Sequence, residues 1–311
     1  MPRGTAQRTG NHHTAQRWAG FLRQSGHRVR IEDEWRGAAA DALIALHARK
    51  SAESVEKFHH ECPERPLIVA LTGTDLYRDI DKSADAQHAL ELATRLIVLQ
   101  PRGRSHLARH LRSKTRVIYQ SADTRLTHRP PRGCFRLVVV GNLRDEKDPF
   151  RAAEALAHLP ARAEIELIQI GAALSPAMAQ TARRLVRRDP RYRWTQSKPH
   201  GEALRLMASS HLLIVSSVME GGANVICEAS RIGVPVLASR VSGNIGMLGA
   251  DYAGYFPLFD DRKLARLIDR GIKDKAFYAK LKSSVLARRG LFAPSAERLG
   301  LEALIGELAV P

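Results

Sequence analysis

The chain has 311 residues, too many for one ordinary core and about the length of two domains. With 44% hydrophobic and 26% charged residues, it is not a disordered chain. No apolar run approaches the roughly 18 residues of a membrane helix, and the first residues lack the apolar core of a signal peptide. Three cysteines without CxxC spacing exclude a disulfide scaffold and a cysteine zinc cluster. We expect a soluble, cytoplasmic protein.

The charge is the unusual part of the composition, because 49 Lys and Arg stand against 32 Asp and Glu, a net of +17. Three interpretations are open: a nucleic-acid-binding protein, a merely basic surface, and a cleft that gathers anionic substrates. The arginines are scattered along the chain, and 5% aromatic residues offer little to stack on bases. Nucleic-acid binding is therefore the least favoured of the three, and we expect no nucleic-acid partner.

Strand-like runs alternate with helical segments in the first half, which is typical of an α/β fold with a parallel sheet. Residues 1–12 contain no apolar run, so the strand that normally opens a doubly wound domain is expected to be missing. The expected strands are 28–32, 41–47, 66–72, 95–100 and 116–120, and the expected helices are 13–25, 51–61, 84–94 and 104–113.

The second half repeats the alternation after a proline-rich linker at 122–133. The expected strands are 135–141, 164–171, 192–196, 212–217, 234–239 and 254–258, followed by helices over 261–309 that break near Gly290 and Pro294. We predict two Rossmann-like domains facing across a cleft, with boundaries at 1–131, 132–290 and, for a last helix, 291–311.

The segment EGGANVICEA (220–229) follows a predicted strand and opens a helix near Ala223. Glycines at such a turn let a phosphate approach the backbone N–H groups of the helix start. One carboxylate on the loop and one on the helix can accept paired hydroxyl hydrogen bonds from the two sugars of a nucleotide-sugar. The donor-binding candidates here are Glu220, Gly221, Gly222, Asn224 and Glu228.

The segment GNLRDEKDP (141–149) directly follows the first predicted strand of the second half. Arg144 and Lys147 stand on the strand-to-helix turn, where fixed cations suit a diphosphate whose negative charge grows as its bond to sugar breaks. We predict a catalytic role for Arg144, Lys147 and Glu220.

These motifs, G-x-L-x-x-x-K (141–147) and E-x7-E (220–228), with GVPVLAS (233–239) and SGNIG (242–246), resemble family 4 glycosyltransferases of the GT-B fold. The resemblance implies that Lys147 binds the donor diphosphate, Glu220 the sugar and Glu228 the ribose. It also implies that the last helix returns to the first domain. The family commonly has a basic residue after the motif glycine; here Asn142 stands there, and Arg144 is the candidate for that charge.

The first half narrows the resemblance. GNHHTAQRWAGFL (10–22), ALHARKSAESV (45–55), LTGTDLYRDI (71–80) and DYAGYFP (251–257) are similar to selenosugar synthases of selenoneine biosynthesis. That resemblance implies transfer of a hexose, such as N-acetylglucosamine or glucose, from a UDP-sugar to selenophosphate. A carbon–selenium bond forms, and UDP and phosphate are released. We expect neither a cofactor nor a metal.

Many relatives carry a histidine beside the strand that corresponds to 66–72, where this chain has Thr72, Gly73 and Thr74. Selenophosphate is already anionic and nucleophilic, so positioning and charge neutralisation suffice for it. An alcohol or thiol acceptor remains the alternative, and an alcohol benefits from a base. The acceptor-binding candidates are Gly10, Asn11, Thr14, Arg17, His47, Arg49, Lys50, Ser51, Thr74 and Asp75.

Several of these candidates have a second interpretation. Arg17 and Lys50 also fit solvated helix charges, and Ser51 fits an N-cap for helix 51–61. Asp75 either orients a basic neighbour or caps a helix. We expect Trp18 and Cys227 to be buried core residues rather than parts of a site.

Overall fold

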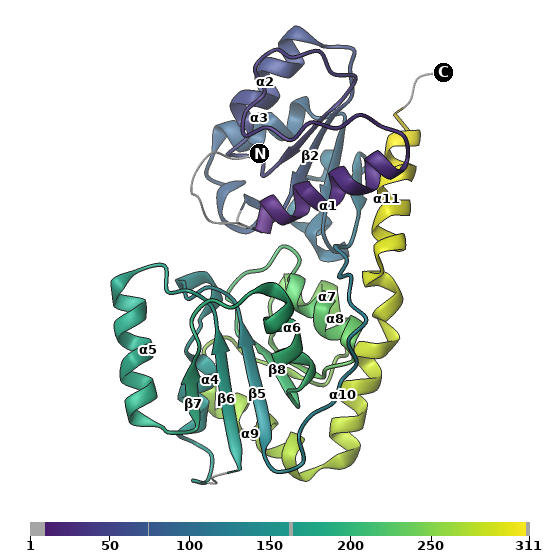
Figure 1. Ribbon diagram of the computed structural model, residues 1–311. Helices are drawn as coiled ribbons and strands as arrows, with labels where there is room; N and C mark the ends of the chain where they lie inside the picture. Colours follow the sequence, from purple (N-terminus) through teal and green to yellow (C-terminus); the bar gives the residue numbers. More distant parts are fainter. Residues whose placement is uncertain (1–9, 74, 162–163, 309–311) are drawn as a thin grey trace. The chain divides into compact units, whose positions relative to one another are not determined.

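The computed structural model describes residues 10–73, 75–161 and 164–308. Its contacts divide the chain into two compact units, each with its own parallel sheet (Figure 1). The first unit holds the chain up to Ser121, the short segment Glu220–Gly222 and the chain from Pro294 onward; the second holds Ala122–Met219 and Ala223–Ala293. The α/β class with parallel sheets that the sequence predicts is confirmed.

The first unit contains a four-stranded sheet whose strands lie side by side in chain order. Its strands are β1 (Leu43–Leu46), β2 (Leu67–Leu71), β3 (Arg95–Val98) and β4 (Thr115–Val117), and its helices are α1 (Gly10–Gln24), α2 (Ala52–Glu61), α3 (Ala84–Leu92) and α11 (Pro294–Gly306). Every residue of β2 is buried, as expected of a central parallel strand covered on both faces.

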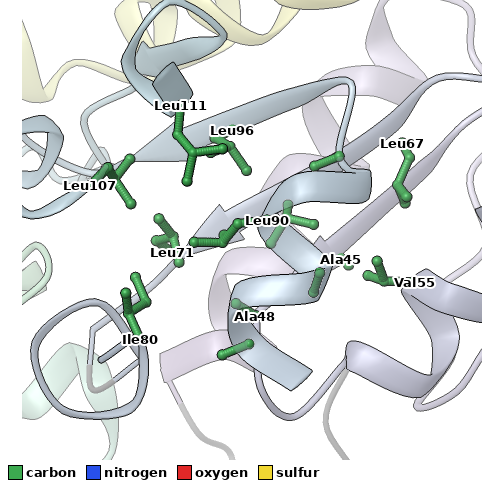
Figure 2. Packing of buried hydrophobic residues seen from close by; sticks show 14 of the residues in the cluster. Ala45, Ala48, Val55, Leu67, Leu71, Ile80, Leu90, Leu96, Leu107 and Leu111 are labelled. Carbon is green, nitrogen blue, oxygen red and sulfur yellow. The ribbon is translucent and has the colours of Figure 1, made fainter. Parts of the chain in front are cut away.

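The alternation of side chains along β2 separates two apolar clusters. Leu67 and Leu71 lie in a cluster with residues of α2 and α3, such as Val55 and Leu90 (Figure 2). The intervening residues, Ile68 and Ala70, lie in a second cluster with Trp18 of α1 and with Leu301 and Leu304 of α11. The first unit is therefore a three-layer sandwich with the sheet in the middle, and Trp18 is a core residue as predicted.

Two predicted elements of the first unit are wrong. Residues 28–32 form no strand: they are irregular, since no strand in the described ranges lies beside them to pair with their backbone groups. The helix expected at 104–113 is replaced by two 3₁₀ segments, Pro101–His106 and Arg109–Arg112. Leu107, which follows the first segment, and Leu111, which lies in the second, are both buried.

The second unit contains a six-stranded parallel sheet in the order β10-β9-β8-β5-β6-β7. Its strands are β5 (Phe135–Val140), β6 (Ile165–Ile170), β7 (Tyr192–Trp194), β8 (Leu212–Val215), β9 (Val236–Ser239) and β10 (Tyr255–Phe256). β5 lies between β6 and β8, so the strand order reverses there. In open α/β sheets, ligands bind beyond the carboxyl ends of the strands at such a reversal.

The helices of the second unit follow the predicted alternation. They are α4 (Arg151–Leu156), α5 (Pro176–Arg188), α6 (His200–Ala208), α7 (Asn224–Ile232), α8 (Ser242–Leu248), α9 (Asp261–Lys273) and α10 (Lys275–Ala287). The predicted breaks near Gly290 and Pro294 are confirmed by a 3₁₀ segment, Arg289–Phe292, ahead of α11. Within the described ranges, no helix is both long and apolar enough to cross a membrane.

Candidate functional site

The loops after β5 and β6 meet at the carboxyl edge of the second sheet. Gly141 and Gly171, which end these strands, have φ values of +152° and +151°. A Cβ atom on Gly171 would lie 1.9 Å from the Gly141 carbonyl oxygen, so only glycine allows this approach. The Asn142 side-chain oxygen accepts a hydrogen bond from the Ala172 N–H at 3.2 Å. The glycine-ended strands of the sequence thus bring two loops into backbone contact.

The loop that carries Lys147 is also attached to the end of β8. The Ser216 hydroxyl is placed to donate to the carbonyl oxygens of Lys147 and Asp148, at 3.1 and 2.7 Å. The Val218 N–H donates to the Glu146 carbonyl at 2.9 Å. The chain continues from β8 to Glu220, the sugar-binding candidate. These bonds therefore attach the loop of Lys147, the diphosphate-binding candidate, to the segment that leads to Glu220.

The two predicted cations of this loop differ in exposure. Arg144 is exposed and forms no ion pair with another described residue, whereas Lys147 is half-buried at the end of a short 3₁₀ turn, Asp145–Lys147. The next residue, Asp148, has a φ of +41° and accepts a hydrogen bond from Arg151 of α4 at 2.8 Å. The loop is therefore anchored at its carboxyl end as well, and Arg144 lies exposed between the buried Leu143 and the 3₁₀ turn.

A third loop at this edge follows β9. The Ser239 hydroxyl donates to the Ser217 carbonyl at 2.5 Å, and the Asn244 amide of α8 donates to the Ser239 carbonyl and hydroxyl oxygens at 3.0 Å. The amide oxygen of Asn244, Oδ1, is buried and has no hydrogen-bond partner in the described part of the chain. In the sequence, the motifs GVPVLAS (233–239) and SGNIG (242–246) mark this region.

Helix α7 begins at Asn224, close to the predicted start, after the buried Glu220 and the glycine pair Gly221–Gly222. Asn224 Oδ1 is buried and has no hydrogen-bond partner among the described residues. Glu228 lies one turn further, with its side chain 13% exposed, and its Oε1 lies 2.9 Å from His200 Nε2 at the start of α6. This bond raises the pKa of His200 against the opposing effect of burial.

His200 is a neighbour of the donor candidates that the sequence analysis did not single out. One feature of the sequence could have indicated it: His200 is a polar residue at the start of a helix that follows β7, a strand of the same sheet. Its pairing with α7 depends on the packing of α6 against α7 and is not visible in the local sequence.

At the carboxyl edge of the first sheet, the fully buried Asp75 joins two loops. Its carboxylate accepts hydrogen bonds from the N–H groups of Ala48 at 3.1 Å, Thr72 at 3.3 Å and Gly73 at 2.8 Å. Asp75 also begins a π-helix, Asp75–Asp79. Thr74, the neighbouring candidate, lies outside the described residues.

His47 lies beside this carboxylate, with its Nδ1 3.9 Å from Asp75 Oδ2. Its side chain is buried, its φ is +81°, and the Lys50 N–H donates to its Nδ1 at 3.4 Å. Residues 72–75 contain no histidine, but the loop after the adjacent strand β1 brings His47 beside them. Asp75 does have a basic neighbour, one of the two interpretations of the sequence.

Two acceptor candidates on α1 make structural bonds. The Thr14 hydroxyl donates to the Gly10 carbonyl at 3.0 Å and accepts from Gln120 at 2.6 Å. Arg17 donates twice to the buried Glu297 of α11, at 2.7 and 3.1 Å. Glu297 also accepts from the indole N–H of Trp18 at 2.6 Å and from the Ser121 N–H at 2.7 Å.

The remaining acceptor candidates surround the start of α1 and the loop after β1. Gly10 and Asn11 lie in the first turn of α1, while Arg49 and Lys50 are exposed. Ser51 is at the N-cap position of α2, but its hydroxyl donates to the Leu46 carbonyl at 3.0 Å instead of capping the helix. The N-cap interpretation of the Ser51 side chain is therefore wrong.

Within the described residues, no group of three or more His, Cys, Asp or Glu side chains gathers in a way that would hold a metal ion. The polar groups at the carboxyl edges of both sheets are hydrogen-bond donors, hydrogen-bond acceptors and individual charged side chains. Such groups suit the binding of anions and hydroxyls.

Residues 125–285, slightly more than half of the chain, match the family model described as glycosyl transferases group 1. The chain belongs to this family. The match covers both donor-side motifs and the strands and helices that position them. The broader prediction, a glycosyltransferase, is confirmed.

Solved structures of other proteins have a similar fold. HepE of Anabaena, solved in complex with UDP, has a TM-score of 0.74 at 19% identity, over 86% of this chain and 79% of that chain. Sucrose-phosphate synthase from Thermosynechococcus elongatus has a TM-score of 0.72 at 20% identity, over 86% and 73%. A glycosyltransferase from Rickettsia africae ESF-5 has 0.68 at 12% identity, over 99% and 84%. The predicted fold, two Rossmann-like domains of the GT-B type, is confirmed.

Proposed function

We propose that this group 1 glycosyltransferase transfers a hexose from a UDP-sugar to selenophosphate. The selenium lone pair attacks the anomeric carbon, the bond from that carbon to the diphosphate oxygen breaks, and its electron pair leaves on UDP. Water then cleaves the phosphorus–selenium bond, so that a hexose selenol and phosphate remain. The proposal has two parts, the donor and the acceptor, which depend on different observations.

The donor part is supported by the second unit. The family match covers this region, and HepE, which shares the fold, was solved with UDP and with UDP-glucose. On this chain, Arg144 and Lys147 would neutralise the diphosphate, and the N–H groups at the start of α7 would favour the same anion. By resemblance, Glu220 would receive hydroxyls of the hexose and Glu228 those of the ribose. The single observation that carries this part is the set of hydrogen bonds from β8 to the Lys147 loop.

The acceptor part depends on the resemblance of the first half to selenosugar synthases. Exposed Arg49 and Lys50 stand at the carboxyl edge of the first sheet, where positive charge suits an anionic nucleophile. Arg17 and Thr14 were acceptor candidates too, and their bonds to Glu297 and Gln120 give both a structural role besides. Asp75 contributes to the acceptor side indirectly, because its carboxylate holds the loops after β1 and β2 together.

A second candidate, transfer to an alcohol or thiol, is favoured by one observation. The imidazole of His47 lies beside the 72–75 loop, with its Nδ1 3.9 Å from Asp75 Oδ2, and an imidazole there suits the removal of a proton from a hydroxyl acceptor. Selenophosphate needs no such base. The pair therefore makes His47 the residue that separates the two acceptor classes.

The test is to incubate the protein with UDP-glucose or UDP-N-acetylglucosamine and with selenophosphate, thiophosphate or glycerol in parallel, and to identify products by mass. We expect a selenosugar, weaker transfer to thiophosphate and none to glycerol. We also expect His47→Ala to raise the KM for selenophosphate, as the loss of an acceptor-binding residue should, and to leave kcat largely unchanged. Transfer to glycerol alone, abolished in His47→Ala, would overturn the selenophosphate proposal in favour of the second candidate.

A further inference from the structure

The contact between His200 and Glu228 connects two helices of the second unit. His200 opens α6, the helix after β7, and Glu228 lies in α7, the helix after β8. The Nε2 and Oε1 atoms are 2.9 Å apart, within normal hydrogen-bond distance. The two residues are 28 positions apart in the chain, so the contact is made by tertiary packing.

The two side chains differ in their surroundings. The Glu228 carboxylate is 13% exposed, while the His200 imidazole is 70% exposed. A mostly buried carboxylate loses part of its hydration and needs a partner in the protein. The bond engages one of its two oxygens, and a carboxylate accepts further hydrogen bonds at the other.

The charged groups on the packed elements identify Glu228 as the partner that acts on His200. α6 packs against α7 and β5. Besides Glu228, the charged residues of these elements are Glu202 and Arg205 on α6, Arg231 on α7 and Arg136 on β5. Glu202 is bound by Lys198 at 2.8 Å, and Arg136 by Glu166 at 2.7 Å. The pKa of His200 is raised by its hydrogen bond to Glu228, while burial lowers it.

We infer that His200 is a positioning residue for nucleotide binding: it holds the Glu228 carboxylate in the orientation in which its other oxygen receives the ribose hydroxyls of the donor. This inference rests on the proposed function, because it takes the nucleotide as the ligand of Glu228. His200 itself need not touch the nucleotide. It acts by fixing one rotamer of Glu228 and by balancing its charge before the ligand arrives.

The inference predicts a dependence on pH with a definite sign. The charged imidazole is present below its raised pKa and is lost as pH rises through that pKa. Nucleotide affinity should therefore fall as pH rises from 6.5 through the raised pKa of His200, beyond any change that the phosphate groups of UDP produce. A glutamine at position 200 still donates an N–H but carries no proton that titrates, so this excess should vanish in His200→Gln.

The experiment measures dissociation constants by calorimetry for UDP and for 2′,3′-dideoxyuridine diphosphate, which lacks both ribose hydroxyls. The variants are His200→Ala, His200→Gln and a matched control, His158→Ala. His158 also lies in the second unit and pairs with an acid, Asp261, at the same 2.9 Å. Thermal unfolding of each variant checks that it is folded.

We expect His200→Ala to weaken UDP binding about three- to tenfold, the range of one lost hydrogen bond, and to leave the dideoxy analogue unchanged. His200→Gln should restore most of the affinity, and His158→Ala should have no effect. Equal losses for UDP and the dideoxy analogue, or unchanged UDP affinity in His200→Ala, would overturn the inference. Wild-type protein that does not bind UDP would overturn the proposed function itself, which separates the two failures.

Discussion

The carboxyl edges of the two sheets use their polar residues differently. At the second sheet, the donor candidates Arg144 and Lys147 stand on a loop whose backbone is fixed by other residues, such as Ser216 and Asn142. In the first unit, several side chains predicted for the acceptor make the fixing bonds themselves, as Asp75 and Arg17 do. A residue that fixes the backbone around it is thus tested by protein stability, and a residue on a loop that others fix is tested by ligand affinity.

The largest expected effect tests the structural role assigned to the first unit. Glu297→Ala should lower the free energy of unfolding by about 3–5 kcal/mol, because it leaves Arg17 and the Trp18 indole without their buried partner. Urea denaturation followed by tryptophan fluorescence measures it. Glu307→Ala is the control: its pairs with Arg95 and Arg116 are partly exposed, so its cost should be much smaller than that of Glu297→Ala. Equal costs for the two variants would contradict the account.

The next effect tests the donor edge. Glu228→Ala and Lys147→Ala should each weaken UDP binding by about 10- to 150-fold, the equivalent of one lost charge-assisted hydrogen bond of ~1.5–3 kcal/mol. Glu220→Ala should chiefly impair binding of the sugar half. Calorimetry with UDP and with a UDP-sugar measures both. The control is Glu154→Ala, whose carboxylate pairs with Arg188 of α5. If UDP affinity is unchanged in both Glu228→Ala and Lys147→Ala, the donor assignment is wrong.

A smaller effect separates the acceptor candidates from one another. Lys50→Ala should raise the KM for selenophosphate about three- to tenfold at an unchanged unfolding midpoint, since Lys50 is exposed. Arg17→Ala should lower the unfolding midpoint because Arg17 holds Glu297. Steady-state kinetics and thermal unfolding give the two readouts, with exposed Lys57→Ala as the control. A Lys50→Ala enzyme with wild-type KM would remove Lys50 from the acceptor site.

The smallest effect concerns pH and the second unit alone. Burial lowers the pKa of His128 and of His211 to about 4, below the ordinary value of 6.5. Between pH 4 and pH 6.5, these two histidines bind more protons in the unfolded chain than in the folded protein. The free energy of unfolding is therefore highest above pH 6.5 and falls as pH is lowered towards 4. We expect the urea midpoint reported by Trp194, the second unit's tryptophan, to fall between pH 7 and pH 5. His211→Asn should reduce that fall; an equal fall would contradict it.

The sequence predicted most of the fold because the signals are local. Runs such as 66–72 and 135–141 are apolar enough to indicate buried parallel strands, and the turn residues beside them mark their ends. The run at 28–32 has a different signal, an alternation of Val29 and Ile31 with charged residues, and a strand of this kind also needs a neighbour that no local pattern reveals. Element identity was therefore predictable, and pairing was not.

For the candidate site too, local features were predictable from the sequence and contacts between distant residues were not. The loops at 141–148 and 220–224 were predictable because glycine, charge and strand end lie together in the sequence. The pairs His200–Glu228 and Arg17–Glu297 were not, since 28 and 280 residues separate their members. Asp75 is intermediate: its place in a loop was predictable, but its bond to the Ala48 N–H depends on the pairing of β1 with β2.

The central claim is that the donor nucleotide binds at the carboxyl edge of the second sheet. Hydrogen exchange followed by mass spectrometry, with and without UDP, tests it most directly. We predict slower exchange of backbone amides in 141–148 and 216–229 on addition of UDP, with unchanged exchange in α5, which lies outside these loops. Bound UDP without protection of these two segments, or with protection confined to other segments, would contradict the claim.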